Sequence, residues 1–196
     1  MGKIFYLMGK SASGKDTIYK RIREACPELK TIVLYTTRPM RDGETDGVEY
    51  HFTTEEALTA FQEAGKMIEI RTYQTVYGPW SYATVDDGSV DPEHENYLVI
   101  GTLESYQKLR EYFGEEAVEP IYITVDDGLR LERALARERM QKEPKYEELC
   151  RRFLADQADF SAENLEKGGI GKEYRNENLE NCVEEILENI RNYTDF

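Results

Sequence analysis

Cysteine, histidine and long apolar segments are all scarce in this sequence of 196 residues. The three cysteines, Cys26, Cys150 and Cys182, are odd in number and lie far apart without CxxC spacing, which argues against a disulfide framework and a zinc site. His51 and His94 are too isolated to suggest histidine-based catalysis. The first apolar run is too short for a signal peptide or a membrane span. We therefore expect a soluble, cytoplasmic protein with no membrane partner.

Basic residues are outnumbered as well. The chain has 25 Lys and Arg against 39 Asp and Glu, which gives a formal net charge of −14 at pH 7. Such a charge repels nucleic acids and anionic membranes, so a nucleic acid polymer is not an expected partner. The length suits one compact domain, and both a monomer and a homodimer remain open.

Short apolar strands alternate with helical stretches along much of the chain. The first strand precedes a loop and a helix over residues 15–25, in which Ile18 and Ile22 recur at helical spacing. The expected strands are residues 3–8, 31–35, 97–101 and 120–125. This alternation predicts an α/β fold with a central parallel sheet flanked by helices.

Two segments depart from this alternation. Between the second and third strands, residues 47–52, 67–73 and 81–85 form short alternating runs around a helix with a capping box from Thr53 to Glu56. These runs predict a small, mostly antiparallel inserted subdomain. From Asp127 the chain is helical and charged with a break near Pro144, which predicts two hinged helices that form a lid. Residues 166–174 are expected to be a flexible linker before a last helix.

A glycine-bounded loop follows the first strand. Gly9, four further residues, Gly14 and Lys15 fit the phosphate-binding template G-x-x-x-x-G-K-[ST], except that Asp16 stands at its last position. Glycines let backbone N–H groups turn toward an anion, and the helix N-terminus adds positive charge. The alternative is an ordinary turn between strand and helix. The predicted ATP-binding residues here are Gly9, Ser11, Ala12, Ser13, Gly14, Lys15, Asp16 and Thr17.

Asp16 makes this loop unusual. A carboxylate beside a triphosphate is repulsive unless a cation lies between them, so we expect binding that depends on Mg²⁺. Asp16 and Thr17 are the predicted metal ligands.

A second cluster of cations follows the strand expected at residues 31–35. Arg38 and Arg41 lie three positions apart, and Tyr50 closes the turn-rich segment after them. Two guanidinium groups and a phenol suit a monophosphate, because arginine offers bidentate donors. The alternative is that both arginines are solvated surface charges.

Together the two motifs resemble those of the guanylate kinase family, whose monophosphate segment runs close to T-T-R-x-P/M-R-x-G-E-x-x-G-x-x-Y-x-F. The matching residues are Thr36, Thr37, Arg38, Arg41, Gly43, Glu44, Gly47, Tyr50 and Phe52. Residues 67–78 are similar to the family segment that carries a base-reading glutamate, here Glu69, and a phosphate-binding tyrosine, here Tyr77. Further along, Arg133 and Arg137 match the paired arginines of the lid. Arg152 matches an arginine of the next helix, and Asn176 matches an asparagine near the adenine of ATP.

The resemblance implies both an architecture and a reaction. It implies a core of about residues 1–34, 96–126 and 172–196, a monophosphate-binding subdomain of about 35–95, and a lid of about 127–171. The reaction would be transfer of the γ-phosphoryl group of ATP to GMP with Mg²⁺. Lys15, Arg38, Arg137 and Arg152 would be the catalytic cations, and Arg38, Arg41, Tyr50, Glu69 and Tyr77 would bind GMP.

Three positions on the acceptor side depart from the family pattern. Leu34 and Tyr35 stand where the family has a serine that helps to read guanine, Gly101 replaces an acidic residue, and Pro79 replaces a small hydroxyl residue. A kinase for another nucleoside monophosphate or for a ribose bisphosphate is therefore one alternative. A non-catalytic binding module is another, but it is disfavoured by the retained Lys15.

Overall fold

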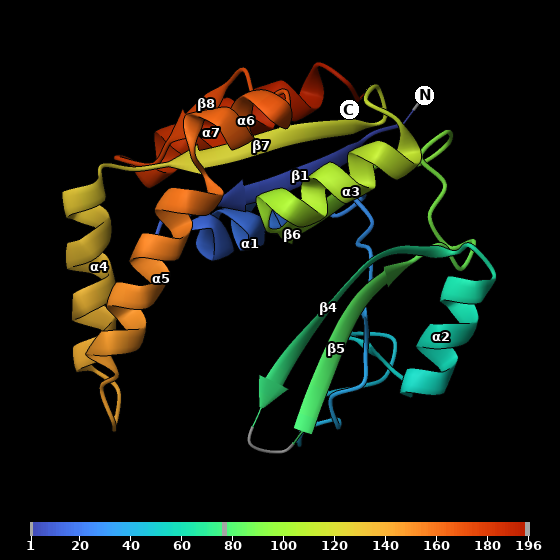
Figure 1. Ribbon diagram of the computed structural model, residues 1–196. Coiled ribbons are helices and arrows are strands. Elements are labelled where there is room, and N and C mark those ends of the chain that lie inside the picture. The colour runs from blue at the N-terminus through green and yellow to red at the C-terminus, as the bar shows by residue number, and fades with distance from the viewer. Residues whose placement is uncertain (1, 76–77, 195–196) are drawn as a thin grey trace.

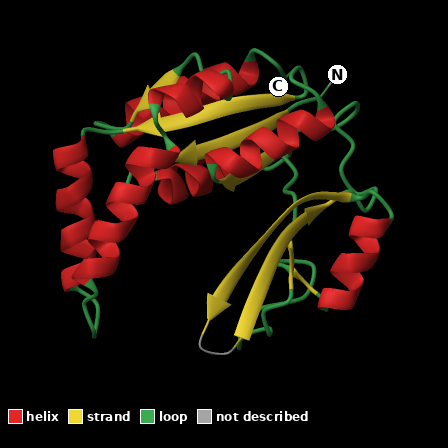
Figure 2. Cartoon of the chain, in the orientation of Figure 1, coloured by secondary structure: helices red, strands yellow, loops and turns green. Residues whose placement is uncertain are grey.

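The first strand, β1 (Ile4–Gly9), is buried along its whole length and is an inner strand of a four-stranded parallel sheet. The computed structural model describes residues 2–75 and 78–194. β1 lies between β6 (Tyr97–Gly101) and β7 (Val118–Thr124), and β8 (Glu173–Arg175) adds to β7. Figures 1 and 2 show this sheet covered by helices on both faces. The predicted α/β fold with a parallel sheet is confirmed.

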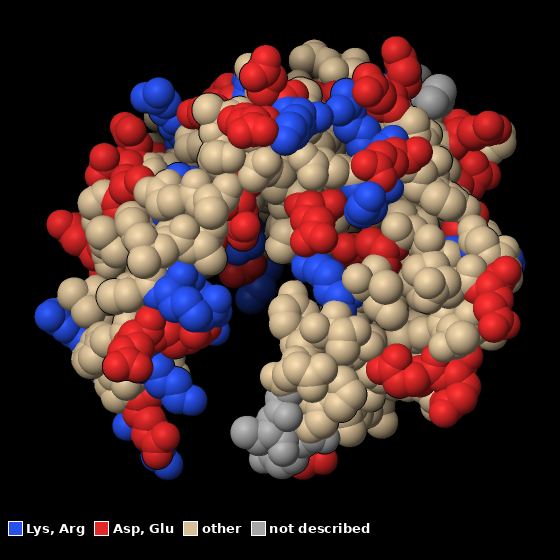
Figure 3. Space-filling view, viewed as in Figure 1, with Lys and Arg blue, Asp and Glu red and all other residues tan. Residues whose placement is uncertain are grey.

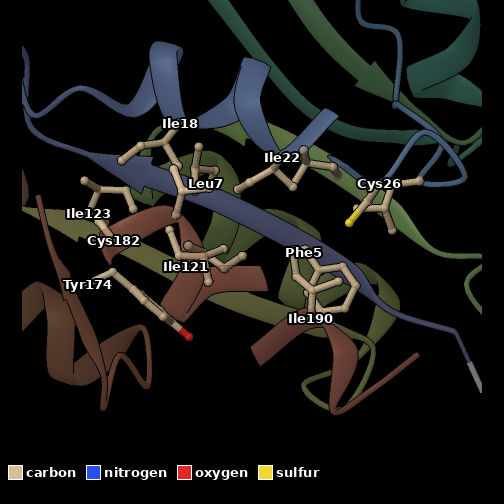
Figure 4. Packing of buried hydrophobic residues seen from close by; sticks show 14 residues of the cluster. Phe5, Leu7, Ile18, Ile22, Cys26, Ile121, Ile123, Tyr174, Cys182 and Ile190 are labelled. Atoms are coloured by element: carbon tan, nitrogen blue, oxygen red, sulfur yellow. The ribbon is translucent and has the colours of Figure 1, made fainter. Parts of the chain in front are cut away.

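Alternation along β1 divides the core into two clusters, because successive side chains of a strand point to opposite faces. Phe5 and Leu7 pack with α1 (Lys15–Ala25) and α7 (Leu179–Arg191), as Figure 4 shows. Ile4, Tyr6 and Met8 pack on the opposite face with α3 (Leu103–Phe113). Burying one such side chain contributes about 1.5–3 kcal/mol to the free energy of folding. Packing on both faces therefore holds β1 in place, and with it the start of the loop that follows.

The inserted subdomain has its own sheet and a small core. The strand order is β3-β2-β5-β4, in which the β2–β3 pair is parallel and the other two pairs are antiparallel. The strands are β2 (Tyr35–Thr36), β3 (His51–Phe52), β4 (Met67–Thr75) and β5 (Gly78–Val85), and α2 (Glu55–Glu63) covers them. The helix begins one residue later than predicted, because the Thr54 side chain, and not Thr53, caps it by accepting from Ala57 N.

Two lid helices lie on either side of Pro144, as predicted: α4 (Asp127–Arg139) and α5 (Tyr146–Asp159). They pack on each other and project from the end of the sheet toward the same side as the subdomain (Figure 1). The next helix, α6 (Ala162–Lys167), lies on the core, where Leu165 and Ile170 pack against the second cluster. The segment predicted as lid, residues 127–171, therefore includes a helix that packs on the core.

Two strand predictions were wrong. Residues 31–34 are not a strand of the core sheet. The neighbouring Lys30 forms only an isolated bridge with Tyr97, and pairing resumes at Tyr35 in the subdomain sheet. Conversely, β8 lies in the segment predicted to be a flexible linker, where Tyr174 is buried and pairs in register with Ile123. β8 has only three residues and follows a glycine-rich segment, so it is too short to show the alternation of apolar and polar residues that predicts a strand.

No helix in the described part of the chain is both long and apolar enough to cross a membrane.

Arg130 of α4 joins the lid helices to the loop after β1. Its side chain is 2% exposed, and Nη1 donates to Asp156 Oδ2 of α5 (2.9 Å) and to Ser11 O of the loop (3.3 Å). Nε donates to Asp127 Oδ1 (3.0 Å), and the guanidinium lies 4.2 Å from the centre of the Phe153 ring. A buried charge held by this many partners fixes the base of the lid relative to the loop.

We predict that Arg130→Met lowers the free energy of unfolding by about 3 kcal/mol, because the largely buried Asp156 loses its counter-ion. Urea denaturation measures this change. Arg151→Met is the matched control, since Arg151 pairs with Glu148 on an exposed helix face, where an ion pair contributes about 0–1 kcal/mol. Equal losses in the two variants would contradict the structural role of Arg130.

Candidate active site

The four parallel strands end at one edge of the sheet. Their last residues are Gly9, Gly101, Thr124 and Arg175. Ligands of open α/β sheets bind outside the carboxyl ends of the strands. The predicted phosphate-binding loop lies at this edge, directly after β1.

The loop has a tightly packed backbone that requires its glycines. A Cβ at Gly9 would lie 2.6 Å from Ile123 O of β7. Gly14 has a φ of 91°, and a Cβ there would lie 2.2 Å from Asn176 Nδ2. That amide nitrogen donates to Ser13 O (2.8 Å), and Asn176 is buried directly after β8. Asn176 thus holds the loop through a carbonyl group. Its predicted contact with adenine stays a prediction.

The lid contacts the other end of the loop. The carboxylate of Asp156 accepts from Ser11 N (2.9 Å), and Arg130 donates to both Asp156 and Ser11 O. Arg133, a predicted ATP-binding residue, donates from Nη2 to Asn176 O (3.2 Å). The loop is therefore held from α4, from α5 and from the residue that follows β8.

Loop and lid border an open cavity of about 640 Å³, which we call the loop cavity. Six of the residues singled out from the sequence line it: Ser11, Ala12, Lys15, Asp16, Arg137 and Arg152. Figure 3 shows a deep hollow between the lid side and the subdomain side of the molecule, with basic side chains on its walls. Thr17, the other predicted metal ligand, is exposed on α1. Arg152 donates from Nε to Glu148 Oε1 (2.7 Å). Hydrogen bonds from Arg151 and then Arg152 lower the pKa of Glu148 to about 2.

The monophosphate motif gathers around Glu44. Arg38 is 4% exposed and forms two bonds with this carboxylate, Nη1 to Oε2 (3.0 Å) and Nη2 to Oε1 (2.7 Å). The hydrogen bond from Arg38 lowers the pKa of Glu44, which also accepts from Arg41 N (2.7 Å). The Tyr50 ring lies 5.4 Å from the Arg38 guanidinium. The structure thus brings Arg38, Arg41 and Tyr50 together, with Arg38 already paired to a carboxylate.

Glu69 lies in a smaller cavity of about 260 Å³, the inner cavity, which Tyr50 also lines. Its side chain is buried and accepts three hydrogen bonds. Ser105 Oγ donates to Oε2 (2.8 Å), while Thr84 Oγ1 and Arg71 Nη2 donate to Oε1 (3.3 Å each). A buried carboxylate with such partners is a directional acceptor for a ligand that carries N–H groups.

Tyr6 explains the glycine at position 101. It is 2% exposed, and its hydroxyl fills the place where a side chain at Gly101 would begin, since a Cβ there would lie 2.0 Å from Oη. Burial raises the pKa of Tyr6. Both residues line the inner cavity together with Glu69. A side chain at position 101, where the family pattern has an acidic residue, would therefore overlap the Tyr6 phenol.

The guanylate kinase family model matches residues 1–148. The protein belongs to the guanylate kinase family. The guanylate kinase of Salinibacter ruber is 28% identical over 97% of this chain and 96% of its own length, and that of Helicobacter hepaticus is 28% identical over 70% and 68%. The Frankia casuarinae enzyme is 49% identical, but over only 32% of this chain and 34% of its own.

A crystal structure of the guanylate kinase from Anaplasma phagocytophilum has the same fold. It is 20% identical in sequence and superposes with a TM-score of 0.65, covering 97% of this chain and 85% of that one. The family resemblance drawn from the two motifs is confirmed.

Several residues of the site escaped the sequence analysis. Arg130 and Asp156 lie in a helical segment with many charges, and no spacing distinguishes them. Tyr6 is one of the 14 tyrosines. Arg71 had a usable signal, because it lies two positions after Glu69 in a strand and so shares its face. The predicted phosphate-binding Tyr77 lies outside the described residues.

We predict that Gly101→Ala lowers the free energy of unfolding by about 1–3 kcal/mol, because the added methyl overlaps the buried Tyr6. Thermal or urea denaturation measures the loss. Gly171→Ala is the control, since a Cβ there meets nothing within 4 Å. Similar stability of the two variants would show that Tyr6 does not hold this position.

Proposed function

We propose that this member of the guanylate kinase family transfers the γ-phosphoryl group of ATP to GMP. One observation carries the proposal. Lys15, Arg137 and Arg152 line the loop cavity, and Glu69 and Tyr50 line the inner cavity. Between them is a central cavity of about 370 Å³ that Lys15 and Arg71 both line. The proposed phosphate and base sites would therefore lie in cavities that share lining residues, Lys15 on one side and Arg71 on the other.

Phosphoryl transfer requires alignment of the two phosphates and neutralisation of the transferred charge. Lys15 would hold the β- and γ-phosphates, with the loop from Gly9 to Thr17 around them. Arg137 and Arg152 would approach the transferred group from the lid and exclude water. No catalytic base is needed, because a monophosphate oxygen is already nucleophilic.

The acceptor would be held at both ends. Arg38, Arg41 and Tyr50 would bind its phosphate, which requires Arg38 to exchange part of its pairing with Glu44 for phosphate oxygens. Glu69 would accept from the N1–H and N2–H₂ groups of guanine. Tyr77 joins this proposal through the family resemblance alone, as does the contact of Asn176 and Arg133 with ATP.

Magnesium fits the residues of the loop cavity. Asp16 adds a hard carboxylate oxygen beside Lys15, and such oxygens are preferred by Mg²⁺. The described residues contain no group of three or more His, Cys, Asp or Glu that could hold a metal by themselves. We propose that Asp16, with Thr17 nearby, would hold the ion together with the phosphates of ATP. The bound ion would neutralise charge on those phosphates.

The remaining assignments complete the proposal. We propose a core of about residues 1–34, 96–126 and 172–196, a monophosphate subdomain of about 35–95 and a lid of about 127–171. We place the protein in the cytoplasm, as a monomer or homodimer that binds small nucleotides. The net charge of −14 supports the expectation that it does not bind nucleic acid polymers.

A substrate panel tests the acceptor. With ATP, we expect GMP to be phosphorylated with a higher kcat/KM than AMP, CMP, dTMP or a ribose bisphosphate, because Glu69 pairs with adjacent N–H donors. The series is repeated over a range of Mg²⁺ concentrations, and activity should fall as Mg²⁺ is removed. A panel in which GMP has no advantage would overturn the guanylate assignment, and activity independent of Mg²⁺ would overturn the role of Asp16.

Lys15→Met should lower kcat by about a hundredfold or more while leaving the free energy of unfolding unchanged, because a fixed charge at the transferred phosphate acts mainly in the transition state. Steady-state kinetics and urea denaturation separate the two effects. Lys20→Met is the matched control, because Lys20 is exposed on the same helix. A kcat close to that of the unmodified protein would contradict the role of Lys15.

A further inference from the structure

Arg71 lines both the inner cavity and the central cavity. It belongs to β4, two residues after Glu69, and pairs in register with Tyr82 of β5. Beside the inner and central cavities lies a third of about 430 Å³, the aromatic cavity, lined by Leu34, Tyr50, Arg71, Tyr73, Trp80 and Tyr82. Among the described residues that line these three cavities, Arg71 alone lines all of them.

The guanidinium of Arg71 is poorly satisfied. Nη2 donates to Glu69 Oε1 at 3.3 Å, and Nη1 donates to Thr102 Oγ1 at 3.5 Å. Its Nε is buried and has no hydrogen-bond partner. Arginine has five N–H donors, and charged pairs normally form bonds of about 2.7–2.9 Å. Arg38, by contrast, forms two short bonds with Glu44. Of these two guanidinium groups, Arg71 has the greater unused capacity for anionic oxygens.

Its position also fits a phosphate that moves between the two sites. A nucleotide whose base lies beside Glu69 must direct its phosphate toward Lys15 if the phosphoryl group is to be transferred. Arg71 lines the inner cavity with Glu69 and the central cavity with Lys15, Gly9 and Ser11. Its contact with Thr102, at the start of α3, spans from the subdomain to the core.

From these observations we infer that Arg71 binds the phosphate of the acceptor nucleotide at the junction of the inner and central cavities. The inference rests on the proposed function, since it takes GMP as the ligand. Bound phosphate oxygens replace the long contact with Thr102 and engage the unpaired Nε, while the bond to Glu69 is kept. Arg71 thereby connects recognition of the base with placement of the phosphate.

A simpler role is that Arg71 only neutralises Glu69. The two roles predict different affinities for a ligand without a phosphate when Arg71 is lost. A counter-ion of Glu69 supports binding of the base, so its loss weakens GMP and guanosine equally. A phosphate-binding residue supports GMP and leaves guanosine nearly unaffected.

The test compares the affinities of the full chain for GMP and guanosine by equilibrium dialysis with labelled ligands. Arg71→Gln should weaken GMP binding by about tenfold to a hundredfold, the factor for losing a hydrogen bond between charged groups, and guanosine binding by less than about threefold. Arg71→Lys keeps the charge without the planar fork, so GMP binding should recover in part. Circular dichroism checks that each variant is folded, and Arg71→Lys serves if the glutamine variant is not.

Arg23→Gln is the matched charge control. Arg23 also lines the inner cavity, but from α1 and in an exposed position, so its loss should change the two affinities by the same factor. Equal weakening of GMP and guanosine in Arg71→Gln, or no weakening of either, would overturn the inference while leaving the proposed function intact. Failure of the unmodified protein to bind GMP would overturn both.

Discussion

The need to hold the loop after β1 in place constrains the rest of the structure, and the loop is held mainly through its carbonyl groups, with Ser11 N donating to Asp156 as well. The Ser13 carbonyl accepts from Asn176, and the Ser11 carbonyl accepts from Arg130. The first turn of α1 leaves its N–H groups without intrahelical partners, as at every helix start. The holding groups come from the residue after β8 and from a lid helix, so the sheet edge and the lid must both be in place for the loop to keep its shape.

The same constraint explains why a buried arginine lies in the lid. Arg130 and Asp156 bind each other and also the two polar groups of one loop residue, Ser11. Burial of an ion pair contributes little by itself, because desolvation offsets the attraction. Its value here is geometric. The pair fixes the start of α4 and the end of α5 at the loop, and Arg137 and Arg152 of these helices line the cavity that Lys15 also lines.

Sequence patterns predicted the structure best where a local backbone or packing rule determines the residue type. The glycines of the loop, the apolar run of β1 and the break at Pro144 each express backbone or packing rules that act over a few residues. The Arg38 motif was found by its spacing, but its pairing with Glu44 was not. The strand β8 and the contact of Tyr6 with Gly101 depend on residues far apart in the chain, which no local pattern reveals. The prediction of a strand at residues 31–34 was wrong for a different reason. An apolar run near a cavity has the same local pattern as a buried strand.

Selection of the acceptor base has to arise from an exchange of partners, since Glu69 is not a free group. Its two oxygens offer about four lone-pair positions, and Ser105, Thr84 and Arg71 already use three. A base that presents an acceptor to Glu69 would displace these donors and leave a buried carboxylate poorly paired, which is costly. A base with adjacent N–H donors supplies new hydrogen bonds to Glu69 in place of those it displaces. The network around Glu69 therefore favours a base with a guanine-like hydrogen-bonding edge, even without a side chain at Gly101. The preference arises because a base without such donors would leave the buried carboxylate poorly paired.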